Sequence, residues 1–249
     1  MSLSGVVITF NEELKIERCL KSLQKVCDEI IVLDSFSTDN TCIIAENCGA
    51  KVYKHIFDGH IQQKNRAITY SSSKFVLSLD ADEELSNELI QSINGVKNNF
   101  NFNGYSMNRL NNYGGNWIKH GAWYPDKKLR LWDSTKGCWG GKNPHDKYIL
   151  NENCKIGHLK GNILHYTMNG FDDLKNQTVK FANIAAKSMF EDGLQYNYFQ
   201  IVFKTFFRFV KEYILLLGFL DGIAGLQIAL MNSYYVWLKY TLLIKKYKS

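Results

Sequence analysis

Residues 74–83 read KFVLSLDADE, an apolar run of strand length that ends directly in carboxylates. Three similar runs precede it, at residues 5–10, 29–34 and 51–54, and segments with helical spacing of apolar residues separate them. Strands that alternate with helices at this spacing predict a parallel sheet covered by helices on both faces. The first hundred residues are therefore predicted to form an α/β fold that binds its ligand at the carboxyl ends of the strands.

The helices of this region have recognisable starts and stops. We expect Asn11 to cap a helix that turns Ile16 and Leu20 inward. A second helix should run from about Asp39 to Gly49, where glycine permits a left-handed stop. Residues 61–71 are predicted to be helical, and another helix should begin at Ser86.

The strand ends are unusually polar. The first run ends in TFNE (9–12), the second in DSFSTD (34–39) and the fourth in DADE (80–83). Such residues also cap helices, so capping is the alternative interpretation for 37–39. Asp80 and Asp82 carry more weight because two carboxylates held close after a buried strand repel each other unless a cation lies between them. Oxygen ligands of this kind suit Mg²⁺ or Mn²⁺.

Composition and missing motifs exclude several classes of protein. The 249 residues are 45% hydrophobic and 22% charged, as in an ordinary folded protein. No GxxxxGK[ST] loop, no GxGxxG after the first strand, no GxSxG and no HExxH occurs, which disfavours P-loop ATPases, nicotinamide dehydrogenases, serine hydrolases and zincins. Six cysteines without CxxC spacing and no secretion signal indicate reduced thiols in the cytosol.

The rest of the chain has two different characters. Residues 100–170 are rich in Trp and Gly, which is typical of loops that line a site. Residues 171–195 are predicted to be helical. Residues 201–249 hold seven Lys/Arg against Glu212 and Asp221, so they carry +5 of the net charge of +6. We therefore expect a catalytic domain over 1–198, with halves at 1–100 and 101–170, and an amphipathic helical tail over 199–249.

Three motifs in the expected order resemble a known family. VVITFNEE, IIVLDSFSTDNT and LSLDADE are similar to the strand ends of the family 2 nucleotide-sugar glycosyltransferases, which have the GT-A fold. QQKNRAI, WIKHGAWYPDKKLRLW, NPHDKY and LLGFLDGIAG extend the similarity toward the bacterial lipopolysaccharide core β-glucosyltransferases. The resemblance covers the chain from about residue 4 to residue 245.

The resemblance implies roles for individual residues. The pocket for the base and ribose of the nucleotide would be formed by Thr9, Phe10, Asn11, Glu12 and Asp34. Lys64 and Asn65 would lie near the nucleotide. Asp80 and Asp82 would be the DxD motif, with Asp82 on Mn²⁺ or Mg²⁺ and Asp80 nearer the ribose or the metal's waters. Asp146 would be the general base, with Asp126 as the other candidate.

The chemistry of transfer fits these residue types. A divalent cation stabilises the charge that builds on the departing diphosphate, and one carboxylate in reach of the acceptor hydroxyl removes its proton. The resemblance therefore implies an inverting, metal-dependent transferase. Trp123, Arg130 and His145 are candidates for contacts with the acceptor, although each also has a structural interpretation. The other histidines (His55, His60, His120, His158 and His165) are interpreted as structural.

The same features of the sequence predict the partners of the protein. We expect a nucleotide-sugar donor of the UDP-sugar type and a glycan or lipid-linked acceptor of envelope polysaccharide synthesis. Residues 199–246 should form two helices that lie on the cytoplasmic face of the inner membrane. The alternative is that this tail packs on the catalytic domain or pairs with a second copy of the chain. No nucleic acid partner is expected. The competing functions are a metal-dependent nucleotidyltransferase and a non-catalytic membrane-associated or nucleic-acid-binding module.

Overall fold

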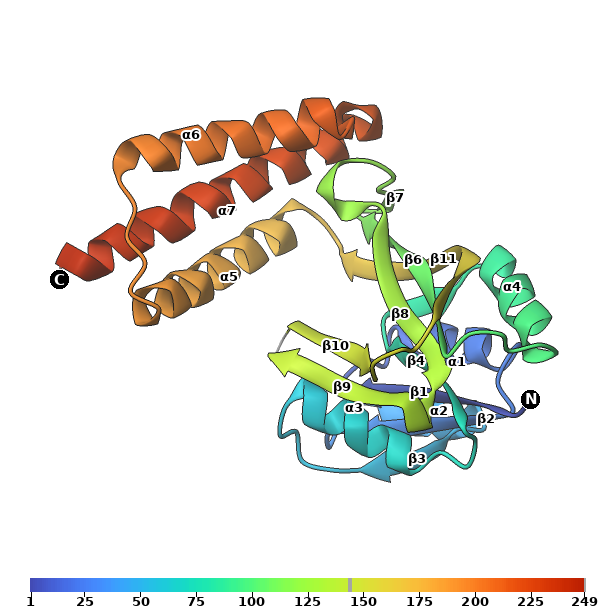
Figure 1. Cartoon of the computed structure of the whole chain (residues 1–249). Helices are drawn as coiled ribbons and strands as arrows, with labels where there is room; N and C mark the ends of the chain where they lie inside the picture. Colours follow the sequence, from blue (N-terminus) through green and yellow to red (C-terminus); the bar gives the residue numbers. More distant parts are fainter. Residues whose placement is uncertain (143–144, 249) are drawn as a thin grey trace. The chain divides into compact units, whose positions relative to one another are not determined.

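The structure is a computed structural model that describes residues 1–142 and 145–248, with only the backbone described at Lys142, His145 and Lys248. The chain forms two compact units (Figure 1). The first consists of Met1–Arg109 and Asp126–His165, and the second of Leu110–Pro125 and Tyr166–Ser249. Strands β6 (Gly104–Tyr113) and β11 (Ile156–Met168) each belong to both units.

A mixed sheet organises the first unit, with strand order β3-β2-β1-β4-β8-β6-β11-β5. The parallel part contains β1 (Leu3–Thr9), β2 (Glu29–Asp34), β3 (Lys51–Lys54) and β4 (Phe75–Asp80). Strand β8 (Asp126–Asp133) is antiparallel to β4 and to β6, and β5 (Glu83–Leu85) is antiparallel to β11. A separate hairpin pairs β9 (Gly137–Lys142) with β10 (His145–Leu150). The predicted α/β fold is confirmed, and the Trp- and Gly-rich segment supplies β6, β8 and β11 of the antiparallel part.

Successive side chains of the parallel strands enter two separate cores. Val7, Val32 and Leu77 pack with residues of α1 (Ile16–Leu23), α2 (Thr41–Asn47) and α4 (Asn87–Lys97). Val6, Ile31 and Val76 pack on the other face with α3 (His60–Thr69) and with the β9–β10 hairpin. Both faces are apolar because both are covered, as expected for a parallel sheet.

The helix boundaries show one wrong prediction. Asn11 does not cap α1, which begins at Ile16. Asn11 has a φ of 53° and accepts a hydrogen bond from the Thr38 backbone N–H at 2.8 Å, so it links two loops. Short polar Asn tolerates this left-handed conformation. Gly49, with a φ of 72°, ends the α2 segment, and Ser86 caps α4 through the Leu89 N–H, both as predicted.

The second unit is mostly helical. It contains β7 (Asn116–Trp117), paired with the end of β6, and the helices α5 (Phe171–Glu191), α6 (Tyr198–Phe209) and α7 (Gly222–Lys248). A π-helical turn (Val210–Leu215) and a 3₁₀ turn (Gly218–Asp221) join α6 to α7. Helices α5 and α6 both pack on α7, through a cluster that includes Ile201, Val236 and Tyr240.

The unit boundaries differ from the expected ones at residues 100, 170 and 198. Helix α5 belongs with α6 and α7 because its apolar residues pack on α7. The segment 110–125 also belongs to this unit, where Asp221 accepts hydrogen bonds from the backbone N–H groups of Lys119 and His120. The sequence pattern identified the helices but not their packing partners.

Candidate active site

A cavity of about 370 Å³ lies at the carboxyl ends of β1 and β4 in the first unit. Its walls come from the ends of β1, β2 and β4, the loop before α3, α3 itself and β10. The lining residues are Ile8, Thr9, Phe10, Glu12, Ser35, Phe57, His60, Lys64, Asp80, Ala81, Asp82 and Asp146. The cavity thus lies where the parallel sheet was predicted to bind its ligand.

A second cavity of about 430 Å³ shares a wall with the first. Lys64, Asp80 and Asp146 line both. The rest of the second cavity is formed by β8, the end of the first-unit part of β6, and the β9–β10 hairpin: Arg109, Lys127, Lys128, Leu129, Arg130, Trp139, Lys147 and Tyr148. Two cavities with a common wall of charged side chains can hold two reactants on opposite sides of that wall.

Lys64 links the two carboxylates of the shared wall. Its Nζ lies 2.9 Å from Asp80 Oδ1 and 2.9 Å from Asp146 Oδ2, and 4.5 Å from the centre of the Trp139 ring. The lysine side chain is only 7% exposed. One buried cation therefore holds Asp80 next to Asp146, which comes from a distant strand of the chain.

Asp80 is held ionised by its neighbours. Its Oδ2 accepts a hydrogen bond from Arg130 Nη2 at 2.7 Å, and Arg130 also contacts Glu83 at 3.0 Å. Burial alone would raise the pKa of Asp80, but the charges of Arg130 and Lys64 outweigh it and keep that pKa well below the usual range. Burial also opposes the charge of Arg130, whose pKa is nevertheless raised by Asp80 and Glu83.

Asp82 has a different environment. Its Oδ2 lies 3.3 Å from His165 Nε2, and it lines the first cavity. A carboxylate beside an imidazole fits a divalent cation whose other ligands are phosphate oxygens and water. The described residues contain no group of three or more His, Cys, Asp or Glu side chains that could enclose a metal by themselves. Asp80 is less suited to bind the metal ion directly, because each of its carboxylate oxygens already forms an ion pair with a cationic side chain.

Three of the residues proposed for the nucleotide pocket line the first cavity. Thr9 Oγ1 is buried and has no hydrogen-bond partner in the described part of the chain, and the Phe10 side chain is exposed. Glu12 also lines it, and burial raises the pKa of its carboxyl.

The other two pocket candidates, Asp34 and Asn11, hold the surrounding loops, as does Asn65, which was predicted to lie near the nucleotide. Asp34 is buried, and both of its oxygens accept hydrogen bonds from Ser37. Asn65 holds the Trp139 backbone through two hydrogen bonds of 2.9 Å, one to its oxygen and one from its N–H. Asn11 bonds Ser37 and Thr38. None of the three is among the lining residues of the two cavities.

The residues predicted to contact the acceptor are not found together in one part of the structure. Arg130 lines the second cavity. Trp123 belongs to the second unit, where it packs with Tyr113 at 6.1 Å between ring centres. The side chain of His145 lies outside the described residues. Asp126 is occupied by Arg109 and Lys128 at 2.9 and 3.0 Å, so it is a poorer base candidate than Asp146.

Sequence reasoning missed several lining residues. Phe57, His60 and Arg109 line the cavities, and His165 faces Asp82, although His60 and His165 had a structural interpretation. Glu83, fully buried beneath Arg130, was noticed only as part of the acidic strand end. Only Glu83 could have been found from the sequence, because it directly follows the DxD motif. The other missed residues lie on loops and strands far from that motif along the chain.

The architecture and the strand-end site define an α/β enzyme-type domain with two adjoining ligand cavities. The profile of the family described as "Glycosyl transferase family 2" matches residues 4–175. The chain belongs to this family, with a GT-A fold.

The sequences of several bacterial proteins agree with this assignment. A Rickettsia typhi protein described as an uncharacterized glycosyltransferase is 30% identical over 234 residues, covering 90% of this chain and 80% of the relative. LpsC, a lipopolysaccharide core biosynthesis glycosyltransferase of Rhizobium meliloti, is 23% identical over 267 residues, covering 97% and 94%. The solved structure of S. aureus TarS has a similar fold, with a TM-score of 0.51 at 17% identity over 90% of this chain and 46% of TarS.

Proposed function

We propose that this glycosyltransferase moves a sugar from a UDP-sugar to a hydroxyl group of a glycan or lipid-linked acceptor, with inversion at the anomeric carbon. The observation that carries the proposal is the position of Asp146 on the wall between two cavities, joined through Lys64 to Asp80. The donor occupies the first cavity and the acceptor enters the second.

The first cavity suits a nucleoside diphosphate. Phe10 and Phe57 are exposed aromatic side chains that can stack on the base of the nucleotide. The Thr9 hydroxyl, which has no partner among the described residues, is available to form a hydrogen bond with the ligand. Asp82 and His165 would hold Mn²⁺ or Mg²⁺. When bound, the cation neutralises the negative charge that develops on the leaving diphosphate.

Asp146 performs the proton transfer. Its carboxylate removes the proton from the acceptor hydroxyl as the hydroxyl oxygen forms its bond to the anomeric carbon. The bond from that carbon to the diphosphate breaks, and its electron pair leaves with the diphosphate. Lys64 keeps Asp146 in place and provides a positive charge beside the leaving group.

Binding and turnover test this proposal. UDP with Mn²⁺ should raise the melting temperature of the protein, whereas NAD, ATP and single-stranded RNA should not. Incubation with a panel of nucleotide sugars should then show UDP release that depends on the metal. Stabilisation by ATP or RNA but not by UDP would refute the assignment.

The acceptor proposal rests on sequence similarity. LpsC, which matches nearly the whole chain, is named for lipopolysaccharide core biosynthesis. We propose that the acceptor is likewise an envelope glycan, built at the cytoplasmic face of the inner membrane.

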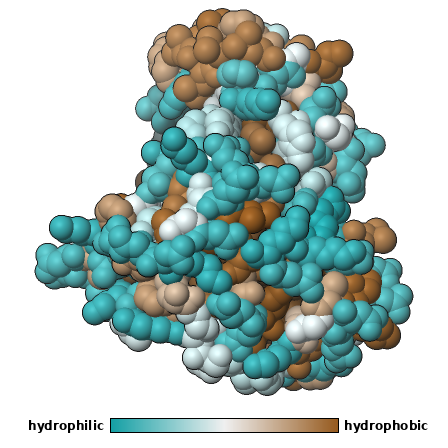
Figure 2. Space-filling view, turned by 90° about the vertical axis from the view of Figure 1, so that its right-hand side faces the viewer, coloured by the Kyte–Doolittle hydropathy of each residue, from teal (hydrophilic) through white to brown (hydrophobic). Residues whose placement is uncertain are grey.

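Helix α6 supplies a surface for that location. Phe199, Val202, Phe203 and Phe206 lie along one side of the helix and are 56–80% exposed. Figure 2, which views the unit from the end where α6 turns into α7, shows that the hydrophobic surface at the top of the view includes this turn. Such a face is suited to the boundary between lipid headgroups and acyl chains.

Two cations of α6 make contacts with side chains of the helical unit itself. Lys204 lies over the rings of Tyr196 and Tyr240, at 5.2 and 5.7 Å, and Arg208 pairs with the buried Glu212. These two charges pack within the helical unit because aromatic and acidic partners are available there. Membrane binding would therefore depend more on the apolar face than on anionic headgroups.

The described helices do not include one that alone has the length and apolar character of a membrane span. Two consecutive helical segments, Tyr198–Leu215 and Gly218–Tyr247, have that length and apolar character together, but the chain bends by 70° between them. Our proposal remains that the pair lies on the membrane surface.

Liposome flotation tests the membrane proposal with the full chain. The variant Phe203→Ser/Phe206→Ser should float much less than the wild type, and raising the salt concentration should have little effect. The matched control Leu14→Ser removes an exposed apolar side chain of the first unit and should float normally. Equal flotation of all three proteins, or flotation of none, would contradict the proposal.

A further inference from the structure

The second cavity carries an excess of positive charge. Its lining contains six cations (Lys64, Arg109, Lys127, Lys128, Arg130 and Lys147) and two carboxylates, Asp80 and Asp146. Glu83 and Asp126, which pair with these cations from outside the lining, raise the carboxylates to four. Six cations against four anions leave a net charge of +2 in and around this cavity.

The excess can be assigned to two residues. Lys64, Arg109, Lys128 and Arg130 all contact carboxylates within 3.4 Å. Lys127, on β8, and Lys147, on β10, form no ion pair with any residue that the structure describes, and both are exposed. Two strands that do not share a hairpin therefore each present one uncompensated ammonium group to the same cavity.

Unused hydrogen-bond donors provide an independent observation. Arg130 Nε and Trp139 Nε1 are buried and have no hydrogen-bond partner among the residues that the structure describes. Both side chains are at least 95% buried, and both residues line the second cavity. Buried donors without partners are costly and normally mark a place for a ligand or an ordered water.

We propose that the second cavity recognises an acidic acceptor, a sugar that carries a phosphate monoester or a carboxylate besides the hydroxyl group that is glycosylated. This inference rests on the proposed function, since it names the class of acceptor. Lys127 and Lys147 bind the anionic group, and Arg130 and Trp139 offer further donors to its oxygens or to the sugar ring. A cavity with such walls concentrates the field of its charges and attracts anions.

The donor cavity does not account for these lysines. Lys127 and Lys147 line only the second cavity, whereas the first contains Lys64 as its lysine. Asp146, on the shared wall, would approach the hydroxyl group of an acceptor held here. The arrangement separates the acidic substituent from the metal-binding Asp82, which lines only the first cavity.

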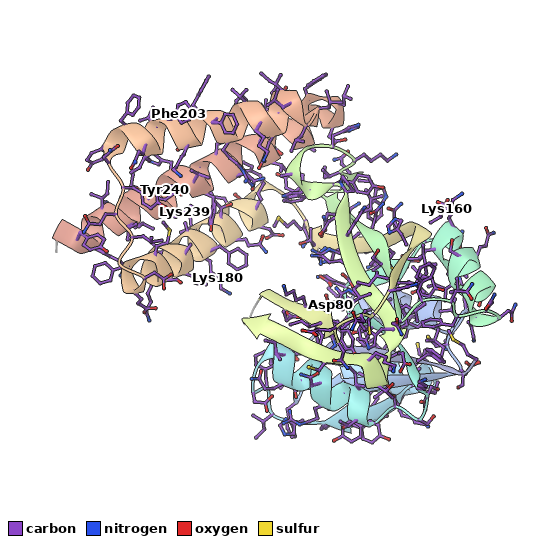
Figure 3. All side chains as sticks on the ribbon, in the orientation of Figure 1. Asp80, Lys160, Lys180, Phe203, Lys239 and Tyr240 are labelled. Carbon is purple, nitrogen blue, oxygen red and sulfur yellow. The ribbon has the colours of Figure 1, made fainter. Side chains whose placement is uncertain are left out.

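Two titrations test the inference with the full chain. UDP with Mg²⁺ is titrated first, which tests the proposed function by itself. Inorganic phosphate is then titrated into protein saturated with UDP and Mg²⁺, so that the first cavity is filled. The proteins are the wild type, Lys127→Gln/Lys147→Gln, and the control Lys160→Gln. Lys160 is an exposed lysine of β11 that lines neither cavity and lies far from Asp80 in Figure 3.

We expect phosphate to bind the UDP-loaded wild type and the control alike, and the double variant at least about tenfold more weakly, as for loss of a hydrogen bond to a charged group. All three proteins should bind UDP equally. Glucose 6-phosphate and glucuronate then show which acidic group is preferred, as each competes with phosphate, whereas glucose should not.

The outcomes separate the two claims. Normal UDP binding without phosphate binding, or with equal phosphate affinity in all three proteins, would overturn the acidic acceptor and leave the proposed function standing. Competition by glucose as strong as that by glucose 6-phosphate would also overturn it. Absence of UDP binding would refute the proposed function, and the acceptor class with it.

Discussion

Asp146→Asn is the substitution that best separates a catalytic role from a structural one. Asparagine has nearly the same shape and keeps an oxygen that can accept the hydrogen bond from Lys64, which now spans 2.9 Å. It cannot take a proton from an acceptor hydroxyl. The change therefore removes the base and leaves the contact.

The two expected effects differ in size. Loss of a general base lowers kcat by roughly 10²–10⁴-fold, which raises the barrier by about 2.7–5.5 kcal/mol. The structural effect is the replacement of the Lys64–Asp146 ion pair by a hydrogen bond from the same ammonium group to a neutral amide oxygen, a loss of about 1 kcal/mol. For a chain of this size the melting temperature should fall by only about 2–4 °C.

Three measurements decide the role of Asp146. Single-turnover transfer should fall by the full factor, UDP affinity by calorimetry should change less than about tenfold, and the melting temperature should change by only a few degrees. Asp126→Asn is the control, because Asp126 is occupied by Arg109 and Lys128. Near-normal transfer by Asp146→Asn, or an equal collapse of UDP affinity, would refute the reasoning.

The remaining predictions concern the metal, acid stability and the backbone. Asp82→Ala should abolish turnover without unfolding the protein, and full activity of this variant in EDTA would contradict a metal role. Burial would raise the pKa of Glu29, but hydrogen bonds from Ser4 and Ser72 outweigh it and lower the pKa to about 2. Its stabilisation is therefore complete above about pH 4.5 and is lost as the pH falls toward 2. Urea unfolding should show Glu29→Gln less stable than the wild type by about 1.5–3 kcal/mol at pH 7 and by almost nothing at pH 2; equal differences at both pH values would exclude this linkage. Gly161→Ala should cost at least about 2 kcal/mol in the same assay, because φ is +93° and the new Cβ would lie 2.3 Å from the Leu89 backbone nitrogen; unchanged stability would show that the backbone relaxes.

The parallel part of the fold could be predicted from local pattern alone. Apolar runs ending at Thr9, Asp34 and Asp80 became β1, β2 and β4, and their ends are neighbours because parallel strands share an edge. Asn11 was misjudged because its conformation depends on contacts with the loop at Thr38, which is 27 residues away. A capping residue and a loop-linking residue have the same chemistry, so sequence cannot separate them.

The site was harder to predict from the sequence, because about half of its residues lie on strands outside the parallel part of the sheet. Arg130 and Asp146 reach Asp80 from β8 and β10, and nothing in the local pattern indicates that pairing. Asp146 was identified by its resemblance to a family motif, and Lys64 likewise. His165, on β11, was interpreted as structural because a single histidine forms no pattern of metal-ligand spacing in the sequence. The sheet nevertheless places its Nε2 atom 3.3 Å from Asp82 Oδ2.

Stability alone does not explain the buried charges around Asp80. Removing carboxylates and cations from water costs several kcal/mol per ion, and well-packed apolar residues often replace such networks without loss. Here Lys64 lies between two carboxylates, while Arg130 contacts both Asp80 and Glu83. Because Arg130 also contacts Asp80, the proposed mechanism allows Lys64 to exchange that contact for an oxygen of a bound diphosphate and to remain paired with Asp146. Under this proposal, the network gives the lysine a resting position from which it would meet the leaving group and still orient the base.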